Sequence, residues 1–346
     1  MNLPQLPLSA LDILPVEVGS EPAAILKATC DLAAHVESLG FTRYWVAEHH
    51  NTPNIASSAP PVIIAALGAA TSSIRVGSGG MMLPNHAPLV VAEQFGTLNA
   101  LYPGRVDLGV GRSTPTDARI ARALRFDARN PAAHDFNGQL ADLIGFLRND
   151  FPADHPLHGV SAVPVYTEQP SLWLLGSSDN GARLAAELGL PFAFAHHFNP
   201  RGSASALRLY KELFRPSEFL SRPYSIVAVS VVCAETDERA RWLAAPAGLA
   251  LLRSATAKPE PFPTPEEAAA HAWTPDQQAF LNQFLGGQAV GGPDRVRERL
   301  STVLEESGAD ELMAVTMVAD IKERTDSMNR LRGLFGDAEL PKGPAF

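Results

Sequence analysis

The chain has 346 residues, enough for two average domains or for one large α/β barrel. Hydrophobic residues make up 46% and charged residues 19%, which excludes a disordered protein, and no apolar run is long enough to span a bilayer. The formal charge of -9 gives no attraction for nucleic acid or an anionic membrane. Small-molecule chemistry is therefore the favoured class of function.

Strand-like and helix-like segments alternate along the chain. Strands are expected over residues 8–14, 43–50, 74–83, 106–111, 171–176, 192–198, 225–234 and 311–318. Helices are expected over residues 22–39, 61–70, 88–101, 136–147, 182–188, 203–214, from 237 onward, 294–307 and 320–334. Eight alternations favour one (β/α)8 TIM barrel, a single domain over residues 1–346, rather than an open doubly wound sheet.

Two segments are longer than a strand-helix unit needs. The first excursion, residues 113–170, follows the fourth strand and includes the expected helix 136–147. The second follows the seventh strand, and its residues 255–277 are rich in Pro, Thr, Glu and Ala with little periodicity. We expect residues 255–290 to form a mobile lid over a site.

The cellular location is indicated by two weak features. The start of the chain lacks the basic segment and apolar core of a signal peptide. Cys30 and Cys233 lie far apart in apolar segments. We therefore expect a cytoplasmic protein with reduced thiols.

The strand that begins at Arg43 runs directly into Glu48, His49 and His50, three groups capable of proton chemistry. In a barrel the site lies at the carboxyl ends of the strands, which makes these residues candidates for catalysis. The alternative is that they are polar strand-end groups that only make hydrogen bonds. Because successive strand residues face opposite sides, the two histidines are badly placed to share an ion, and we expect no metal.

Glycines end the third strand in the run 77–80, which includes Gly79 and Gly80. Such a run lets a flat ring approach the main chain, although a bulge or turn is the alternative. Neither this run nor residues 109–112 has the spacing of a dinucleotide fingerprint, so no NAD site is visible.

Residues 177–181 lie between a strand and a helix, where free backbone N–H groups and hydroxyls bind anions in many barrels. Ordinary helix capping is the alternative, and Asp179 must cap or face water because it would repel a phosphate. Arg112, at the end of the fourth strand, supplies a charge that pairs with phosphate, and Arg125 and Arg129 are further candidates.

Five segments together resemble the bacterial luciferase-like flavin-dependent monooxygenases, in particular their single-chain members. They are residues 45–50 (Trp-Val-Ala-Glu-His-His), 76–84 (Val-Gly-Ser-Gly-Gly-Met-Met-Leu-Pro), 92–95 (Ala-Glu-Gln-Phe), 103–112 (Pro-Gly-Arg-Val-Asp-Leu-Gly-Val-Gly-Arg) and 175–178 (Leu-Gly-Ser-Ser). The resemblance covers nearly the whole chain, and it implies a barrel that binds FMN, is usually a dimer, and receives reduced flavin from a separate reductase.

The resemblance also assigns roles by position. His49 matches the family's catalytic histidine, and Glu48 and His50 match its neighbours in the pocket. Gly79-Gly80 matches a place where the family often has a non-proline cis peptide beneath the flavin. The cofactor-binding residues implied at the phosphate end are Arg112, Gly176, Ser177, Ser178 and Gly181.

The activity implied is an FMN-dependent monooxygenase that uses reduced FMN and O2, through a peroxyflavin, to oxidise a small organic substrate. The departures at Ser177 and Gly181 from the light-emitting enzymes argue against light emission. Rival hypotheses are hydride transfer with the deazaflavin F420, a non-catalytic flavin-binding protein, and a barrel hydrolase that uses the two histidines.

Overall fold

The computed structural model describes residues 2–113, 117–124, 135–165, 168–254 and 260–344. Its sheet contains eight parallel strands that close into a barrel. They are β1 (Leu8–Asp12), β2 (Arg43–Val46), β3 (Arg75–Met82), β4 (Val106–Gly111), β5 (Ser171–Gly176), β6 (Phe192–Ala195), β7 (Ser225–Cys233) and β9 (Glu311–Val315). The sheet closes because β6 pairs with β7, and β9 pairs with both β7 and β1. The predicted TIM barrel is confirmed.

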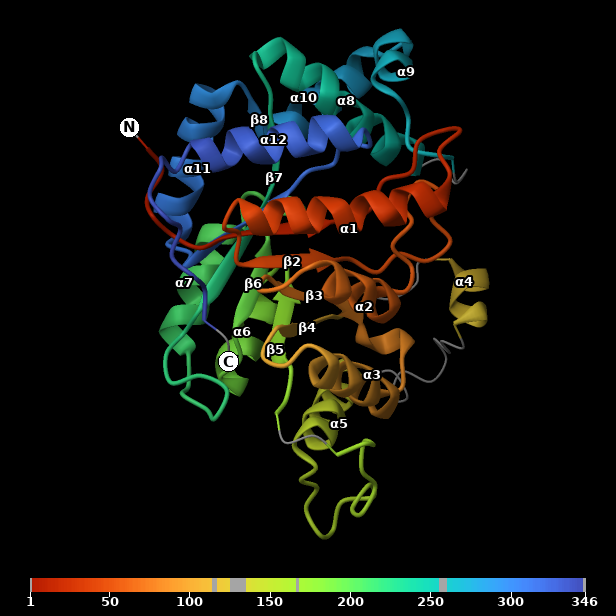
Figure 1. The fold of residues 1–346 in the computed structure, drawn as a ribbon, viewed down its shortest axis with the longest axis vertical. Coiled ribbons are helices and arrows are strands. Elements are labelled where there is room, and N and C mark those ends of the chain that lie inside the picture. Colours follow the sequence, from red (N-terminus) through yellow and green to blue (C-terminus); the bar gives the residue numbers. More distant parts are fainter. Residues whose placement is uncertain (1, 114–116, 125–134, 166–167, 255–259, 345–346) are drawn as a thin grey trace.

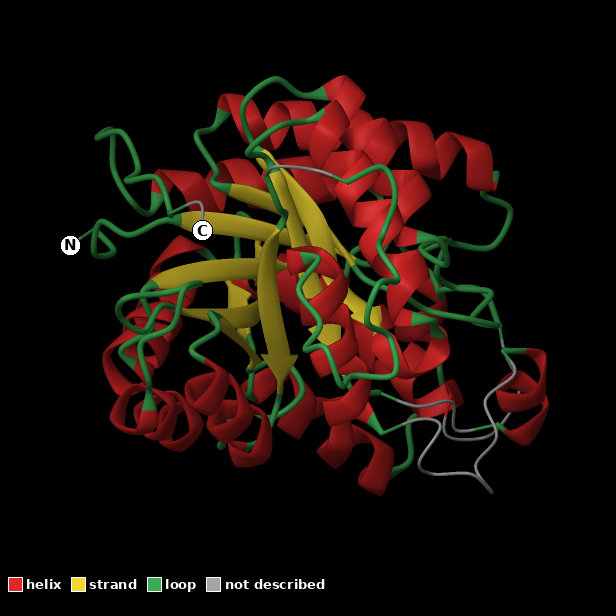
Figure 2. Cartoon of the chain, turned by 90° about the horizontal axis from the view of Figure 1, so that it is seen from below, coloured by secondary structure: helices red, strands yellow, loops and turns green. Residues whose placement is uncertain are grey.

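Helices surround the barrel on its outside (Figure 2). They are α1 (Pro22–Ser38), α2 (Pro60–Ala70), the 3-10 turn η1 (Leu83–Asn85), α3 (Pro88–Leu101), α4 (Ala118–Ala123), α5 (Phe136–Arg148), α6 (Asp179–Leu188), α7 (Ser203–Leu213), α8 (Asp237–Ser254), α9 (Pro265–Ala270), α10 (Pro275–Gly286), α11 (Pro293–Ser307) and α12 (Ile321–Gly333). Proline begins α1, α2, α3 and α11, where its missing N–H has no helical partner to lose. None of these described helices is both long and apolar enough to cross a membrane.

The barrel interior is filled by large side chains. Trp45 of β2 and Trp173 of β5 are fully buried and meet edge to face, with ring centroids 5.3 Å apart. Leu11, Ile226 and Met313 belong to the same interior cluster. The barrel is therefore a packed core, and space for a ligand can exist only near its ends.

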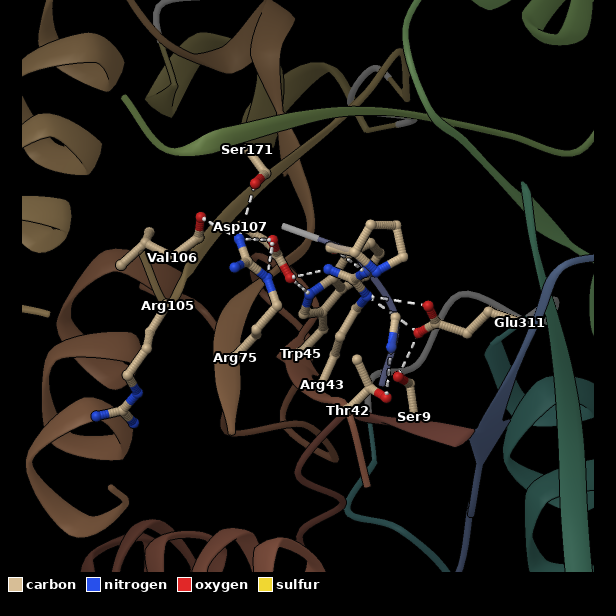
Figure 3. A network of polar contacts seen from close by, with 12 residues as sticks. Ser9, Thr42, Arg43, Trp45, Arg75, Arg105, Val106, Asp107, Ser171 and Glu311 are labelled. Carbon is tan, nitrogen blue, oxygen red and sulfur yellow. Dashed lines mark hydrogen bonds and ion pairs between the residues drawn. The ribbon is translucent and has the colours of Figure 1, made fainter. Parts of the chain in front are cut away.

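A buried polar network closes the amino end of the barrel (Figure 3). Asp107 accepts hydrogen bonds from Arg43 at 3.0 Å, from Arg75 at 2.7 Å and from the indole N–H of Trp45 at 2.9 Å. Arg43 also donates to Glu311 at 3.0 Å. Burial alone would raise the pKa of Asp107, but the two guanidinium charges outweigh it and hold that pKa below its usual range. This network occupies the amino ends and leaves the carboxyl ends for a site.

The structure differs from the sequence-based expectation around the second excursion. The sequence shows little periodicity over residues 255–277, and no helix or strand was expected from 255 to 290, but residues 260–290 contain α9, α10 and the short strand β8 (Ala289–Gly291). Both helices begin with a capping box, Thr264 with Glu267 and Thr274 with Gln277. In Figure 1, α8, α9 and α10 gather at one end of the molecule. Strand β8 pairs with residues 231–233 of β7, outside the closed barrel.

Candidate active site

A cavity of about 390 Å³ opens at the carboxyl ends of the barrel strands. It has the size of a small cofactor site and the position of barrel active sites. Its walls include all seven residues predicted to bind a cofactor: Gly79, Gly80, Arg112, Gly176, Ser177, Ser178 and Gly181. The fold therefore brings together residues from β3, β4, β5 and α6 that are up to 102 positions apart, from 79 to 181.

A larger hollow, of about 750 Å³, lies beside α11. Its polar lining includes Asp237 and Arg295, which form a solvent-exposed ion pair with each other. The residues of this hollow come from β8, α11 and the segments around them rather than from the convergent strand ends. We take the barrel cavity as the candidate site because backbone and side-chain groups from many strands converge there.

Backbone forms one wall of the cavity at Gly79 and Gly80. The peptide bond between them is cis. The pairing of β3 with β4 shifts by one residue at this point, so the strand also contains the bulge-like irregularity that was the alternative interpretation. A Cβ atom on Gly80 would lie 2.8 Å from the carbonyl oxygen of Gly109, and one on Gly79 would lie 2.8 Å from Leu11 Cδ1. A side chain at position 80 would collide with fixed backbone, whereas one at position 79 would require Leu11 to shift; the two glycines leave a flat surface without side chains.

The amino end of α6 forms a polar edge of the cavity. Ser178 is the N-cap residue, but its side chain makes no capping hydrogen bond, unlike Asp135 at α5 and Asp320 at α12. Ser177, Ser178 and Gly181 line the cavity, whereas Asp179 is exposed and is not among the lining residues. The helix starts three residues earlier than expected, so Gly181 lies in its first turn. No described residue hydrogen-bonds to the Ser177 or Ser178 hydroxyl, so this edge presents hydroxyls and helical N–H groups of the kind that bind anions.

Arg112 lies just beyond β4 on the same cavity, exposed to solvent. Within the described ranges it makes no ion pair or hydrogen bond, so its guanidinium is available to a ligand. Arg125 and Arg129 lie outside the described residues. The cavity thus combines a flat glycine wall with a cationic, donor-rich edge.

Glu48 is the centre of a hydrogen-bonded cluster beside the cavity. Its buried carboxylate accepts from His50 Nε2 at 2.8 Å, from His86 Nε2 at 2.9 Å and from the backbone N–H of Met82 at 2.8 Å. Burial would raise the pKa of Glu48, but the His86 bond and charge, with the Met82 bond, lower it below its ordinary value. An ionised carboxylate only accepts, so both histidines donate through Nε2.

His86 was not singled out from the sequence, because it lies on the loop after η1 and approaches Glu48 only in the fold. One ligand atom each of Glu48, His50 and His86 lie within 4.8 Å of one another. Histidine nitrogens and a carboxylate suit several transition metals. The expectation that the protein binds no metal therefore stays a prediction.

His49 is half-buried, and its backbone N–H donates to the carbonyl oxygen of Ser57 at 2.8 Å. Its ring Nδ1 is buried without a partner in the described part of the chain. Burial is the main cause that lowers the pKa of His49, and the nearby His50 adds to it, while Glu48 opposes both. The ring is therefore neutral at physiological pH.

The three predicted catalytic residues do not line the cavity itself. Strand β2 ends at Val46, earlier than expected, so Glu48, His49 and His50 lie on the loop that follows. Their link to the cavity is Met82, which lines it and donates its N–H to Glu48.

The mobile lid expected over residues 255–290 stays a prediction. Residues 255–259 lie outside the described part of the chain. Helices α9 and α10 pack against α8, and neither contributes a residue to the cavity wall. His197, which follows β6, does line the cavity and was not identified from the sequence.

A closed parallel barrel with a polar-edged cavity at the carboxyl ends of its strands is the arrangement found in (β/α)8-barrel enzymes. The family model described as luciferase-like monooxygenase matches residues 13–311. The chain belongs to this family, and it is an oxidoreductase.

Relatives cover almost the whole chain. The uncharacterized protein YvbT of Bacillus subtilis (strain 168) is 44% identical over 88% of this chain and 90% of its own length. A luciferase-like monooxygenase of Escherichia coli (strain K12) is 41% identical over 92% of this chain and 94% of its own. The solved structure of apo-MsnO8 superposes with a TM-score of 0.86 at 36% identity, covering 98% of this chain and 99% of that one.

More distant solved structures share the fold alone. The oxygenating constituent of a 3,6-diketocamphane monooxygenase of Pseudomonas putida, solved with FMN, has a TM-score of 0.68 at 18% identity and covers 98% of this chain and 100% of its own. An F420-dependent secondary alcohol dehydrogenase, solved with an F420-acetone adduct, has a TM-score of 0.69 at 16% identity and covers 96% and 100%. A flavin-type cofactor is common to both.

Proposed function

We propose that the protein is an FMN-dependent monooxygenase that oxidises a small organic substrate with O2. The observation that carries the proposal is the single cavity that joins the flat wall of Gly79 and Gly80 to the anion-binding edge at α6. In this cavity a reduced flavin would supply the two electrons with which one oxygen atom of O2 enters the substrate and the other leaves as water. A separate NAD(P)H:flavin reductase would supply the reduced flavin, because no dinucleotide fingerprint is present in the sequence.

The chain's own residues bind and orient such a cofactor in two ways. Gly79 and Gly80 let the ring system approach the backbone closely. Arg112 pairs with the phosphate, and Ser177 and Ser178 donate hydroxyl hydrogen bonds to it beside the first turn of α6. The deep wall of the cavity includes Leu11, Trp45, Leu174, Leu175 and Met313, whose apolar side chains exclude water from the reacting atoms.

The histidine cluster is proposed to manage protons. Glu48 holds His50 and His86 as donors beside Met82, while His49 keeps an unpaired ring nitrogen. A neutral imidazole can take a proton from a reacting group and return it. We expect His49→Ala to bind FMN within about threefold of the wild type and to lose at least about 100-fold in product formation, a typical value for proton-transfer residues. Wild-type turnover in this variant would remove His49 from the mechanism.

The choice of cofactor is tested by anaerobic titration with reduced FMN and with reduced F420, followed by mixing of the tighter complex with O2. Tighter FMN binding, with a measurable delay before oxidised flavin returns and substrate-dependent O2 consumption, would support the monooxygenase. Preference for F420 would instead support hydride transfer, an activity that the fold also carries in its relatives. Tight FMN binding without any substrate-dependent O2 consumption would support a non-catalytic flavin-binding protein.

The proposal includes a cytoplasmic homodimer. Cys30 and Cys233 are unpaired, as is usual for proteins in a reducing compartment. Exposed apolar side chains gather on α2 and α3, two helices that pack against each other: Val62 is 71% exposed, Leu101 60% and Val90 45%. Such apolar surface is characteristic of an interface between subunits.

A further inference from the structure

His197 is anchored to the barrel wall by its own backbone and ring. Its backbone N–H donates to the carbonyl oxygen of Ala228 in β7 at 3.1 Å, and its ring Nδ1 lies 3.0 Å from the same oxygen. Its carbonyl oxygen accepts from Gln288 Nε2 at 3.1 Å. The two backbone contacts fix the position of residue 197, and the Nδ1 contact orients its ring, which lines the cavity.

The contact with Ala228 determines the tautomer of the ring. A carbonyl oxygen only accepts, so Nδ1 carries the hydrogen and Nε2 carries a lone pair. Nε2 has no hydrogen-bond partner among the described residues. Burial lowers the pKa of His197 to about 4, and no charged side chain contributes to that shift, so the ring is neutral at physiological pH.

The neighbouring His196 is built differently. Its ring points away from the cavity, is almost fully buried, and has Nδ1 2.8 Å from the hydroxyl of Ser203. Both residues lie in the turn that follows β6, and this turn places His197 and Phe198 on the cavity but not His196. His196 is therefore a matched control for a change of histidine outside the site.

We propose that His197 is a specificity-determining residue whose Nε2 accepts a hydrogen bond from an N–H or O–H group of the molecule in the cavity. This inference rests on the proposed function in one respect, that the cavity is the ligand site. The neighbouring wall residues Ala193, Ala195, Phe198 and Ala228 offer no competing side-chain donor. A ligand with a methyl group or a lone pair facing Nε2 would leave the nitrogen unpaired and would bind more weakly.

Two sources of the donor group are chemically possible, the imide N–H of a flavin and an N–H or O–H on the organic substrate. The flavin is tested by comparing FMN with 3-methyl-FMN, in which the imide hydrogen is replaced. The substrate is tested by comparing phenol with anisole, in which the hydroxyl hydrogen is replaced, on protein with and without bound FMN. Dissociation constants are measured by fluorescence titration and calorimetry.

The variants separate the two ring nitrogens. His197→Asn keeps a donor near the position of Nδ1 but removes the acceptor at Nε2, whereas His197→Gln extends an amide oxygen toward the position of Nε2. We expect the wild type to prefer the donor-bearing member of at least one probe pair by about tenfold, the effect of one buried hydrogen bond. His197→Asn should abolish this preference, His197→Gln should retain part of it, and the control His196→Asn should keep all of it.

The inference is overturned if the wild type shows no preference in either pair, or if His197→Asn keeps the full preference. Thermal unfolding of each variant confirms folding, and the His197→Gln comparison decides the question if the Asn variant does not fold. Binding of phenol and anisole to the flavin-free protein also tests the role of His197 separately from the proposed FMN-dependent activity. A protein that does not bind FMN but still distinguishes these probes through His197 would contradict the proposed function and support this inference.

Discussion

The role of an arginine side chain in this protein depends on whether a carboxylate is paired with it. Arg43 and Arg75 are buried and paired with Asp107, whereas Arg112 is exposed and without a partner in the described chain. A buried arginine without its carboxylate costs several kcal/mol, so the first two stabilise the barrel. An arginine without a partner on a cavity edge contributes little to stability and is free to bind an anion.

Replacing Arg112 should therefore affect the ligand rather than the fold. We expect Arg112→Gln to weaken FMN binding by about 2 kcal/mol, roughly 30-fold, because a charged hydrogen bond to the phosphate is lost. Riboflavin, which has no phosphate, should bind the variant as it binds the wild type. Fluorescence titration measures both, with Arg119→Gln in α4 as the control, since Arg119 pairs with Asp117 outside the cavity. Equal losses for the two ligands would disprove the assignment.

At the scale of helices and strands, how well the sequence predicts an element depends on its length and its pattern. Strands β4 and β5 were predicted to the residue because each is a short, mostly apolar segment that ends in glycine. Strand β8 was missed because three residues are too few to show any period. The start of α6 was placed three residues late because its first turn, Asp-Asn-Gly, has the composition of a loop.

Residues of the candidate site, too, could be predicted only where a local sequence pattern marks them. The glycines at 79 and 80 and the residues at 177 and 178 were predicted because each lies in one short segment with a local signal. His86 and His197 were missed because their partners, Glu48 and Ala228, are 38 and 31 positions away. Only the closed barrel brings these residues together, and no spacing along the chain encodes that contact.

The first turn of α6 offers a prediction for an element. Gly181 is helical, and a Cβ there would lie 3.5 Å from Gly176 Cα, an ordinary contact. Gly181→Ala should therefore raise the free energy of unfolding by about 0.5 to 1 kcal/mol. The added methyl narrows the polar edge, so FMN affinity should fall at the same time. Gly333→Ala, with nothing within 4 Å of its Cβ, is the control that should not change FMN affinity. Chemical unfolding and titration test both effects, and unchanged FMN affinity in Gly181→Ala would argue against a phosphate at this edge.

For the whole molecule, acidification should lower the free energy of unfolding because His196 and His197 resist protonation in the folded protein. Burial lowers the pKa of both His196 and His197 from 6.5 to about 4. Between these values the unfolded chain binds more protons than the native protein, so the free energy of unfolding falls as pH falls from about 6.5 to 4. Each histidine should contribute about 1 kcal/mol per pH unit in this window. Urea unfolding at pH 7, 6 and 5 measures the slope, and His196→Asn should reduce it; an identical slope would contradict the assignment.

The exposed apolar face of α2 and α3 leads to a prediction for assembly. If it forms the proposed homodimer interface, Val62→Glu should give a monomer by light scattering, because a buried unpaired carboxylate is costly. Val163→Glu changes a side chain that is 59% exposed on a different segment, and it should leave the dimer intact. A wild-type monomer, or a dimer unaffected by Val62→Glu, would place the interface elsewhere or exclude it.

The barrel is closed by strands from opposite ends of the chain, since β1 pairs with β9 and Ser9 reaches Glu311 across 302 positions. During protein synthesis β1 emerges long before its neighbour exists. At about 20 residues per second, the ribosome needs roughly 15 seconds to add the intervening chain. For that time β1 has one edge without a partner, and the guanidinium of Arg43 lacks Glu311. The nascent protein must therefore wait for β9, the last of the described strands, before the sheet can close, and chaperones that cover exposed strand edges have that interval in which to act.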